Sequence, residues 1–311
     1  MIEILKKILY LVLALGISLY LCSWLKVKIS SRAELRRGFT RTRIKGFSYP
    51  ILKLFRYLGK DQKISIWDFL IFIFSFLLWA FLPVTSYMVI VDLEYSMIAV
   101  FSIYLLLISL YFSQTSVTKY GHVFSNSVKR YAGVMSFVVP LLLCVASMVV
   151  VSKTFNLKEI VNLQYQYYNV IYQPLGFLIA LAAIFFQIKL LDISNRSKLS
   201  FTENSSIETE GFSKLISRIS SYFIIFFLIV FLIILYLGGW KDLYFIKGEI
   251  FLPIKFFLIF IFLLLLRKAT PRLDNYTYLV NINIRFLIPV AGINFIATLV
   301  FFIIRNIYGM I

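Results

Sequence analysis

Long apolar runs separated by shorter polar segments form the pattern of this chain. A helix that crosses the hydrocarbon layer of a bilayer needs about 20 apolar residues, and the runs approach or exceed that length. They lack the strict alternation of apolar and polar residues that is typical of a transmembrane β-barrel. The pattern therefore predicts an all-α integral membrane protein. We expect one membrane domain over residues 1–311 with about eight transmembrane helices, at 4–25, 66–91, 96–114, 131–151, 170–193, 216–239, 251–266 and 286–308.

The polar connections between these runs differ in charge. The segment 26–65 carries twelve Lys and Arg residues against two acids, whereas 92–96 has no basic residue and 241–249 is balanced. Loops rich in Lys and Arg stay on the cytoplasmic or matrix side of a membrane. We therefore expect 26–65, 194–215 and the other basic connections to lie inside, with both termini outside. No small-residue cleavage motif follows the first run, so we expect that run to be a retained anchor.

The composition of the chain further limits the class of protein to which it can belong. Hydrophobic residues make up 61% of the chain, and 32 Lys and Arg against 14 Asp and Glu give a formal net charge of +18. In a soluble protein this charge would suggest nucleic-acid binding, but here the bases crowd beside apolar runs, which indicates topology and partner docking. Cys22 and Cys144 fall inside apolar runs and His122 has no companion ligand. We therefore expect neither a disulfide framework nor a metal site.

One segment of the inside connection 26–65 is patterned as a surface helix. In "YPILKLFRYLGK", from Tyr49 to Lys60, the basic residues fall on the side opposite to an apolar stripe, and Pro50 suits the first turn of a helix. The pattern predicts an amphipathic helix lying along the inner membrane surface. Its stripe consists of Ile51, Leu52, Leu54, Phe55 and Leu58.

Two inside segments are the main candidates for function. The basic run 36–46, "RRGFTRTRIKG", would dock an acidic partner, or it would only contact anionic lipid. The polar island 194–212, "SNRSKLSFTENSSIETEGF", brings carboxylates to a membrane boundary, where a low dielectric perturbs their pKa values. It would relay protons, or it would be a solvated connector. Polar residues within or near the runs are further candidates, with snorkelling towards the interface as the alternative explanation: Asp68, Gln187, Lys189, Lys255 and Asn294.

The last third of the chain resembles a known family. "LGGWKDLYF", a lysine opening the next span, "RKATPR" at 267–272 and "IRFLIPVAGINFIAT" are similar to the subunit-1 family, also called the H-subunit family, of the respiratory complex I, NADH–quinone oxidoreductase. The resemblance extends to the first inside loop, to "VDLEYSMIAV" and to "GHVFSNSVKRYAG", and so covers nearly the whole chain. The matched positions include Gly38, Arg41, Gly46, Pro50, Asp92, Gly238, Gly239, Trp240, Lys255, Arg285, Pro289 and Asn294.

The resemblance implies a role for the polar island. In the family, the connection between the fifth and sixth spans is an acidic loop near the quinone pocket. At the quinone and coupling site it implies Arg41, Asn195, Arg196 and Glu203, together with the nearby Asp192, Glu208 and Glu210. For docking of the peripheral arm it implies Arg36, Arg37, Arg43, Lys45, Arg267 and Arg272.

The chain departs from the family's pattern in the fourth span. The family has an arginine there and, near the middle, a Tyr-Glu pair, whereas this chain has Ser136, Cys144 and Val145 at those positions. A valine can neither hold nor pass on a proton. The departure puts the coupling role in doubt and leaves the fold expectation unchanged.

The resemblance implies a multi-pass subunit of a complex I-type NADH–quinone oxidoreductase, in a bacterial or mitochondrial inner membrane. The chain would line the quinone chamber and help couple quinone reduction to proton translocation, with quinone as the substrate. It would bind no cofactor itself, because flavin and iron–sulfur clusters would lie on partner subunits. Its partners would be the peripheral quinone-site subunits, neighbouring membrane subunits and lipid. Three alternatives stay open: a diverged structural subunit without coupling, an anchor of a related complex, and a free-standing transporter.

Overall fold

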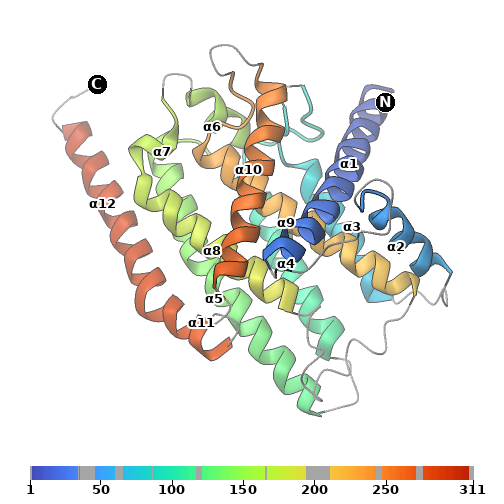
Figure 1. Ribbon diagram of the computed structural model, residues 1–311. Helices are drawn as coiled ribbons and strands as arrows, with labels where there is room; N and C mark the ends of the chain where they lie inside the picture. The colour runs from blue at the N-terminus through green and yellow to red at the C-terminus, as the bar shows by residue number, and fades with distance from the viewer. Residues whose placement is uncertain are drawn as a thin grey trace.

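The computed structural model describes residues 2–33, 35, 46–59, 66–85, 87–116, 121–164, 167–193, 211–242, 247–270 and 276–307. Within these ranges the chain forms helices and connecting turns without a strand (Figure 1). Among the described residues, six helices are long and apolar enough to cross a membrane, and two shorter apolar helices cover Ile66–Ala80 and Pro174–Leu190. The predicted all-α membrane fold is confirmed.

The elements follow one another in this order: α1 (Ile2–Ala33), α2 (Tyr49–Leu58), α3 (Ile66–Ala80), α4 (Ser96–Ser116), α5 (Gly121–Ser152), α6 (Leu157–Leu163), α7 (Asn169–Tyr172), α8 (Pro174–Ile193), α9 (Phe212–Tyr236), α10 (Gly248–Ala269), α11 (Tyr276–Ile282), the π-helical turn η3 (Asn283–Leu287) and α12 (Ile288–Ile307).

Helix α9 is the centre of the bundle. Its side chains from Phe223 to Tyr236 are all buried, and α9 packs against α3, α8 and α10. A helix that is apolar on every side is buried on every side. By contrast, α1, α10 and α12 keep large apolar side chains exposed along one face, among them Leu5, Leu258 and Phe301. Such faces suit contact with lipid.

The bundle has two ends that differ in composition. One end contains α2, the last turns of α1, α8 and α10, and the first turn of α9. We call it the basic end. The opposite end carries α6, α7 and the turns at 81–95 and 237–242. Helix α1 begins and α12 finishes at the opposite end (Figure 1), and Lys153 there places its ammonium group 5.0 Å from the ring centre of Phe302.

Several helices differ from the predicted spans. The span expected at 66–91 stops at Ala80, and the described residues from 81 to 95 are not helical. Pro83 disfavours helix in the residue before it and has no N–H to donate, which suits an end at this point. Helix α5 starts at Gly121, ten residues before the predicted span at 131, because the polar segment before that span continues the same helix.

Proline also marks two interruptions, one near the opposite end and one near the basic end. The span expected at 170–193 is divided into α7 and α8 by Gln173, directly before Pro174. The π-helical turn overlaps the start of the span expected at 286–308 and ends two residues before Pro289. Pro289 has no N–H to donate. A π-helical turn contains one extra residue, which allows the nearby backbone groups to find other hydrogen-bond partners.

The predicted amphipathic helix is present as α2, with Pro50 in its first turn. Its apolar stripe is exposed, from 38% at Leu58 to 65% at Phe55. Phe47 fastens the start of α2 to α1: its carbonyl accepts a 2.5 Å hydrogen bond from the Tyr20 hydroxyl, and its ring packs 5.8 Å from that of Trp24. An exposed apolar stripe on a helix fixed beside the bundle fits the expected position in the membrane interface.

Candidate functional site

Most of the residues predicted for the site lie outside the described residues. This holds for Arg41, Asn195, Arg196, Glu203, Glu208 and Glu210, and for Arg36, Arg37, Arg43, Lys45 and Arg272. Asp192 lies in the last turn of α8 and Arg267 in the last turns of α10. The predicted gathering of carboxylates therefore stays a prediction. The site that the structure describes lies among α1, α8, α9 and α10.

A cavity lies at the basic end among α1, α8, α9 and α10. It is a partly open hollow, and the space between its walls amounts to about 420 Å³ when the part that is open to the surroundings is included. Its walls are mainly aliphatic and aromatic, and none of the described residues that line it is acidic. The lining residues are Lys26, Phe185, Ile188, Lys189, Tyr222, Ile225, Ile229, Phe260, Leu263, Leu264 and Arg267.

Three cations, Lys26, Lys189 and Arg267, stand among these apolar walls. The Lys26 ammonium group lies 5.5 Å from the ring centre of Tyr222 on α9. The Lys189 side chain is almost fully buried and donates a 2.6 Å hydrogen bond to the carbonyl of Thr270, which directly follows α10. Lys189 thus joins the end of α8 to the end of α10 and satisfies a free carbonyl of that helix end.

Helix α2 borders the same region. It packs against α1 and α9, and the Arg218 guanidinium of α9 lies 5.2 Å from the ring centre of Tyr57. Burial, together with the neighbouring charges of Arg218 and Lys26, lowers the pKa of Lys53 to about 8. Burial is the largest of these causes, and the neighbouring positive charges act in the same direction.

Asp68 forms a second polar site at the basic end. This carboxylate, at the start of α3, is fully buried. One oxygen accepts a 2.6 Å hydrogen bond from the Gln114 amide of α4, and the other accepts a bond from the Ser213 hydroxyl of α9. Ser213 lies two residues after Gly211, whose φ of 72° favours glycine. Asp68 therefore fixes the point at which the polar island joins α9.

Lys255 has a structural partner at the opposite end. Its ammonium group donates to the carbonyls of Leu237 (2.6 Å) and Gly239 (3.2 Å), just past the end of α9. The turn there needs the two glycines, since φ is 70° at Gly238 and 48° at Gly239. The Gly-Gly-Trp motif and Lys255 together thus form a cap on the C-terminus of α9.

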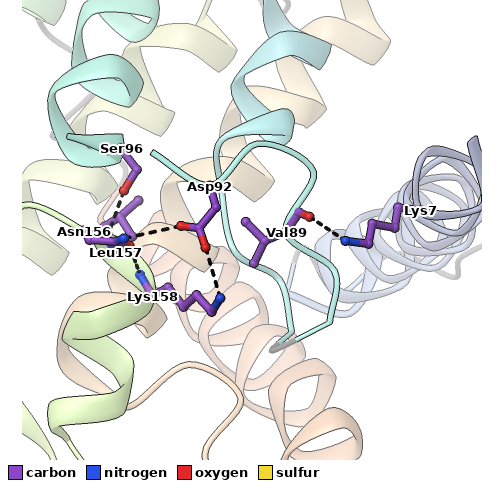
Figure 2. Close-up of polar contacts among 7 residues, drawn as sticks. All are labelled: Lys7, Val89, Asp92, Ser96, Asn156, Leu157 and Lys158. Atoms are coloured by element: carbon purple, nitrogen blue, oxygen red, sulfur yellow. Dashed lines mark hydrogen bonds and ion pairs between the residues drawn. The ribbon is translucent and has the colours of Figure 1, made fainter. Parts of the chain in front are cut away.

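Asp92 also lies at the opposite end, in a network that fastens the loops (Figure 2). Its carboxylate pairs with Lys158 at 3.0 Å and accepts a 3.3 Å hydrogen bond from the amide of Asn156. Asn156 also caps α6 through its side-chain oxygen. The hydrogen bond from Lys158 holds the pKa of Asp92 below its ordinary value, and Asn156 acts in the same direction.

The sequence did not distinguish Lys189 and Tyr222 as cavity residues. The only available signal was a lysine inside an apolar run, which snorkelling also explains. Among the described residues, no group of three or more His, Cys, Asp or Glu side chains could hold a metal ion. The candidate site is thus an apolar hollow bordered by three cations.

The comparisons with known proteins identify the family of this chain. The family model for NADH dehydrogenase matches residues 6–299, almost the whole chain. The chain belongs to this family. The resemblance found in the sequence to the subunit-1 family is thereby confirmed.

Curated relatives of this NADH dehydrogenase family member include the H subunits of the NADH-quinone oxidoreductases of Anoxybacillus flavithermus, a Geobacillus species and Bacillus mycoides. Each is 27% identical over 183 residues, which cover 56% of this chain and 53% of the relative. The chain thus spans about half the length of the curated relatives it matches.

Proposed function

We propose that this chain is the membrane subunit of a complex I-type NADH–quinone oxidoreductase, in which it forms the membrane wall of the quinone chamber. The main observation in support is the apolar cavity at the basic end, which is bordered by the interfacial helix α2. A quinone has a long apolar tail and a small polar ring. The aliphatic and aromatic walls would hold the tail, and cations at the rim would approach the ring oxygens.

The orientation and partners follow from the same proposal. The basic end would face the cytoplasm or matrix, with both termini on the other side. The peripheral quinone-site subunits, which would carry flavin and iron–sulfur clusters, would dock on the basic segment 36–45 and on Arg267 and Arg272. The subunit would sit in an energy-transducing membrane. Electron transfer would occur on the partners, while this chain positions the quinone and excludes water around its tail.

Two adjacent residues of α10 allow a matched test. Leu264 lines the cavity, whereas Leu265 is 52% exposed on the outer side of the helix. Leu264→Trp would fill the space for the tail, and we expect quinone reduction in the assembled enzyme to fall at least about tenfold, the effect of losing one well-oriented binding contact. Leu265→Trp serves as the control and should retain activity. Equal activities at equal subunit content would contradict a quinone chamber at this position.

We also propose that Asp192, Asn195, Arg196, Glu203, Glu208 and Glu210 couple quinone reduction to proton movement, with Arg41 facing the quinone. Carboxylates close together at a low-dielectric boundary raise one another's pKa and so can exchange protons near neutral pH. The support is the family membership and the fixing of this loop's end by Asp68, Gly211 and Ser213.

Glu203→Gln and the double change of Glu208 and Glu210 to Gln test this coupling. We expect fewer protons moved per electron, or slower quinone reduction, while electron transfer from NADH to an artificial acceptor continues. The artificial-acceptor assay is the control for assembly of the peripheral arm. Unchanged pumping and turnover in a fully assembled enzyme would favour the alternative, a structural subunit without coupling.

A further inference from the structure

Helix α9 has two different sides in its first half, the part that reaches the basic end. Tyr222, Ile225 and Ile229 line the cavity. Ser213 and Ser220 are buried, at 3% and 0% exposed. Because an α-helix turns by about 100° per residue, Ser213 and Tyr222 point about 180° apart, and Ser220 lies within about 20° of Ser213. The two buried serines therefore lie on the side of α9 that faces away from the cavity.

The serine side of α9 contacts α3 and α4 through polar atoms. The Ser213 hydroxyl donates a hydrogen bond to the Asp68 carboxylate of α3, whose other oxygen accepts a 2.6 Å bond from the Gln114 amide of α4. About two turns further along α9, the hydroxyl oxygens of Tyr111 on α4 and Ser221 are 3.3 Å apart. Side chains of two neighbouring helices thus hold the basic half of α9.

Apolar packing alone does not fix the rotation of α9 about its axis. The helix is apolar and buried on every side from Phe223 to Tyr236, and burial of apolar surface is not directional. Hydrogen bonds have narrow limits on distance and angle, and buried polar groups can select one arrangement among several. A rotation of α9 would separate Ser213 from Asp68 and leave a buried carboxylate with one donor fewer, which is costly.

The Asp68 carboxylate is well placed at the first turn of α9. Ser213 is the second residue of this helix, and the N-cap residue Gly211 provides no side-chain hydrogen bond. The N-terminus of a helix carries a partial positive charge that favours an anion. Asp68 belongs to α3, yet it supplies a negative charge at this turn. That charge and the two hydrogen bonds offset the cost of burying the carboxylate.

We propose that Asp68 is a positioning residue for the cavity: through Ser213 it holds α9 in the rotation that turns Tyr222, Ile225 and Ile229 into the cavity. Asp68 would contact neither the quinone nor a reacting proton. The identity of the ligand as quinone rests on the proposed function, whereas the control of the cavity wall by Asp68 does not.

Two serines of α9 give a matched test. The Ser220 hydroxyl donates to the Ile216 carbonyl of its own helix, whereas the Ser213 hydroxyl bonds to Asp68. In the assembled enzyme, Ser213→Ala should raise KM for a quinone with a long isoprenoid tail about fivefold and leave kcat nearly unchanged. KM for a quinone without a tail should change by less than about twofold. Equal KM values for Ser213→Ala and Ser220→Ala would overturn the proposal.

Variants of Asp68 separate positioning from proton transfer. In Asp68→Asn the new amide can accept the bond from Gln114 and donate one to the Ser213 oxygen, so KM should stay within about twofold of the wild-type value. Asp68→Val removes both bonds and should raise KM at least as much as Ser213→Ala. If Asp68→Asn and Asp68→Val lost turnover equally, the charge or proton of the carboxylate would be what matters, and the proposal would be wrong.

A structural measurement separates this proposal from the assignment of the ligand. In the wild-type chain the Lys26 ammonium group lies 5.5 Å from the ring centre of Tyr222. A cryo-electron microscopy map of assembled Asp68→Val, or of Ser213→Ala if the first variant does not assemble, should show α9 rotated and the Tyr222 ring displaced from Lys26. An unchanged α9 would overturn the proposal. A rotated α9 with unchanged KM would support positioning by Asp68 and contradict quinone as the ligand of the cavity.

Discussion

The two ends of the bundle use their charged residues differently. At the opposite end, Lys255 bonds carbonyls past α9, and Lys158 bonds Asp92. Lys7 also fastens α1 to the loop through a 3.1 Å hydrogen bond to the Val89 carbonyl (Figure 2). Cations lie over aromatic rings at both ends, as Lys255 does at Phe251 and Lys26 at Tyr222, but at the basic end three cations line one cavity whose described lining includes no acid.

This difference indicates which end is suited to a ligand and a partner. Cations that are bonded to carbonyls or carboxylates of the same chain hold loops and helix ends in place. Three cations gathered around one cavity, with no acidic residue among its described lining, attract an electron-rich or negatively charged group. We therefore expect changes at the opposite end to act on stability and changes at the basic end to act on activity.

The largest stability effect at the opposite end should come from Lys255→Met. This change removes two charge-assisted hydrogen bonds and leaves the carbonyls of Leu237 and Gly239 without their ammonium donor. We expect the free energy of unfolding to fall by about 3 kcal/mol, measured by thermal or denaturant unfolding in detergent. Electron transfer by the variant that still folds should be close to normal.

Lys247→Met is the control for that change. Lys247 directly precedes α10 and is exposed, so its loss should change stability by less than about 0.5 kcal/mol. If both variants were equally stable, the cap on α9 would have no energetic role. If Lys255→Met abolished quinone reduction without loss of stability, the contrast between the two ends would be wrong.

A smaller effect is expected from Asp92→Asn. Asp92 and Lys158 are 46% and 38% exposed, so solvent screens their ion pair and the loss at neutral pH should stay below about 1 kcal/mol. Because the folded-state pKa of Asp92 is lowered, its contribution is present above the unfolded pKa and is lost as the pH falls through the folded value. The wild-type melting temperature should therefore fall more on acidification than that of Asp92→Asn, in a pH series of thermal melts. Parallel curves would refute the contribution.

The sequence predicted the helices well where apolar runs are long and unbroken. The amphipathic helix at 49–58 was also predictable, because its stripe has helical spacing and Pro50 marks its start. Pro83 and Pro174 indicated kinks or breaks within two predicted spans, but the apolar pattern did not place the helix ends at Ala80 and on either side of Gln173. These outcomes depend on proline at Pro83 and Pro174 and on tertiary packing.

The site was harder to predict than the fold. Lys189 and Lys255 each looked like a lysine near a span end, and only the structure distinguishes a cavity residue from a helix cap. Their partners are backbone carbonyls of distant residues, Thr270 and Leu237, and such partners leave no signature in the sequence. The family resemblance indicated the polar island, whereas the described cavity lies among α1, α8, α9 and α10.

Photoaffinity labelling tests the central claim most directly. A quinone analogue with a photoreactive group on its isoprenoid tail would be activated in the assembled enzyme, and the labelled peptides would be mapped by mass spectrometry. We predict label on the lining segments of α8, α9 and α10, around Phe185, Ile225 and Leu264, and loss of that label when excess unmodified quinone competes. Label confined to the lipid-facing side of α12, or label that excess quinone does not reduce, would contradict a quinone chamber at the basic end.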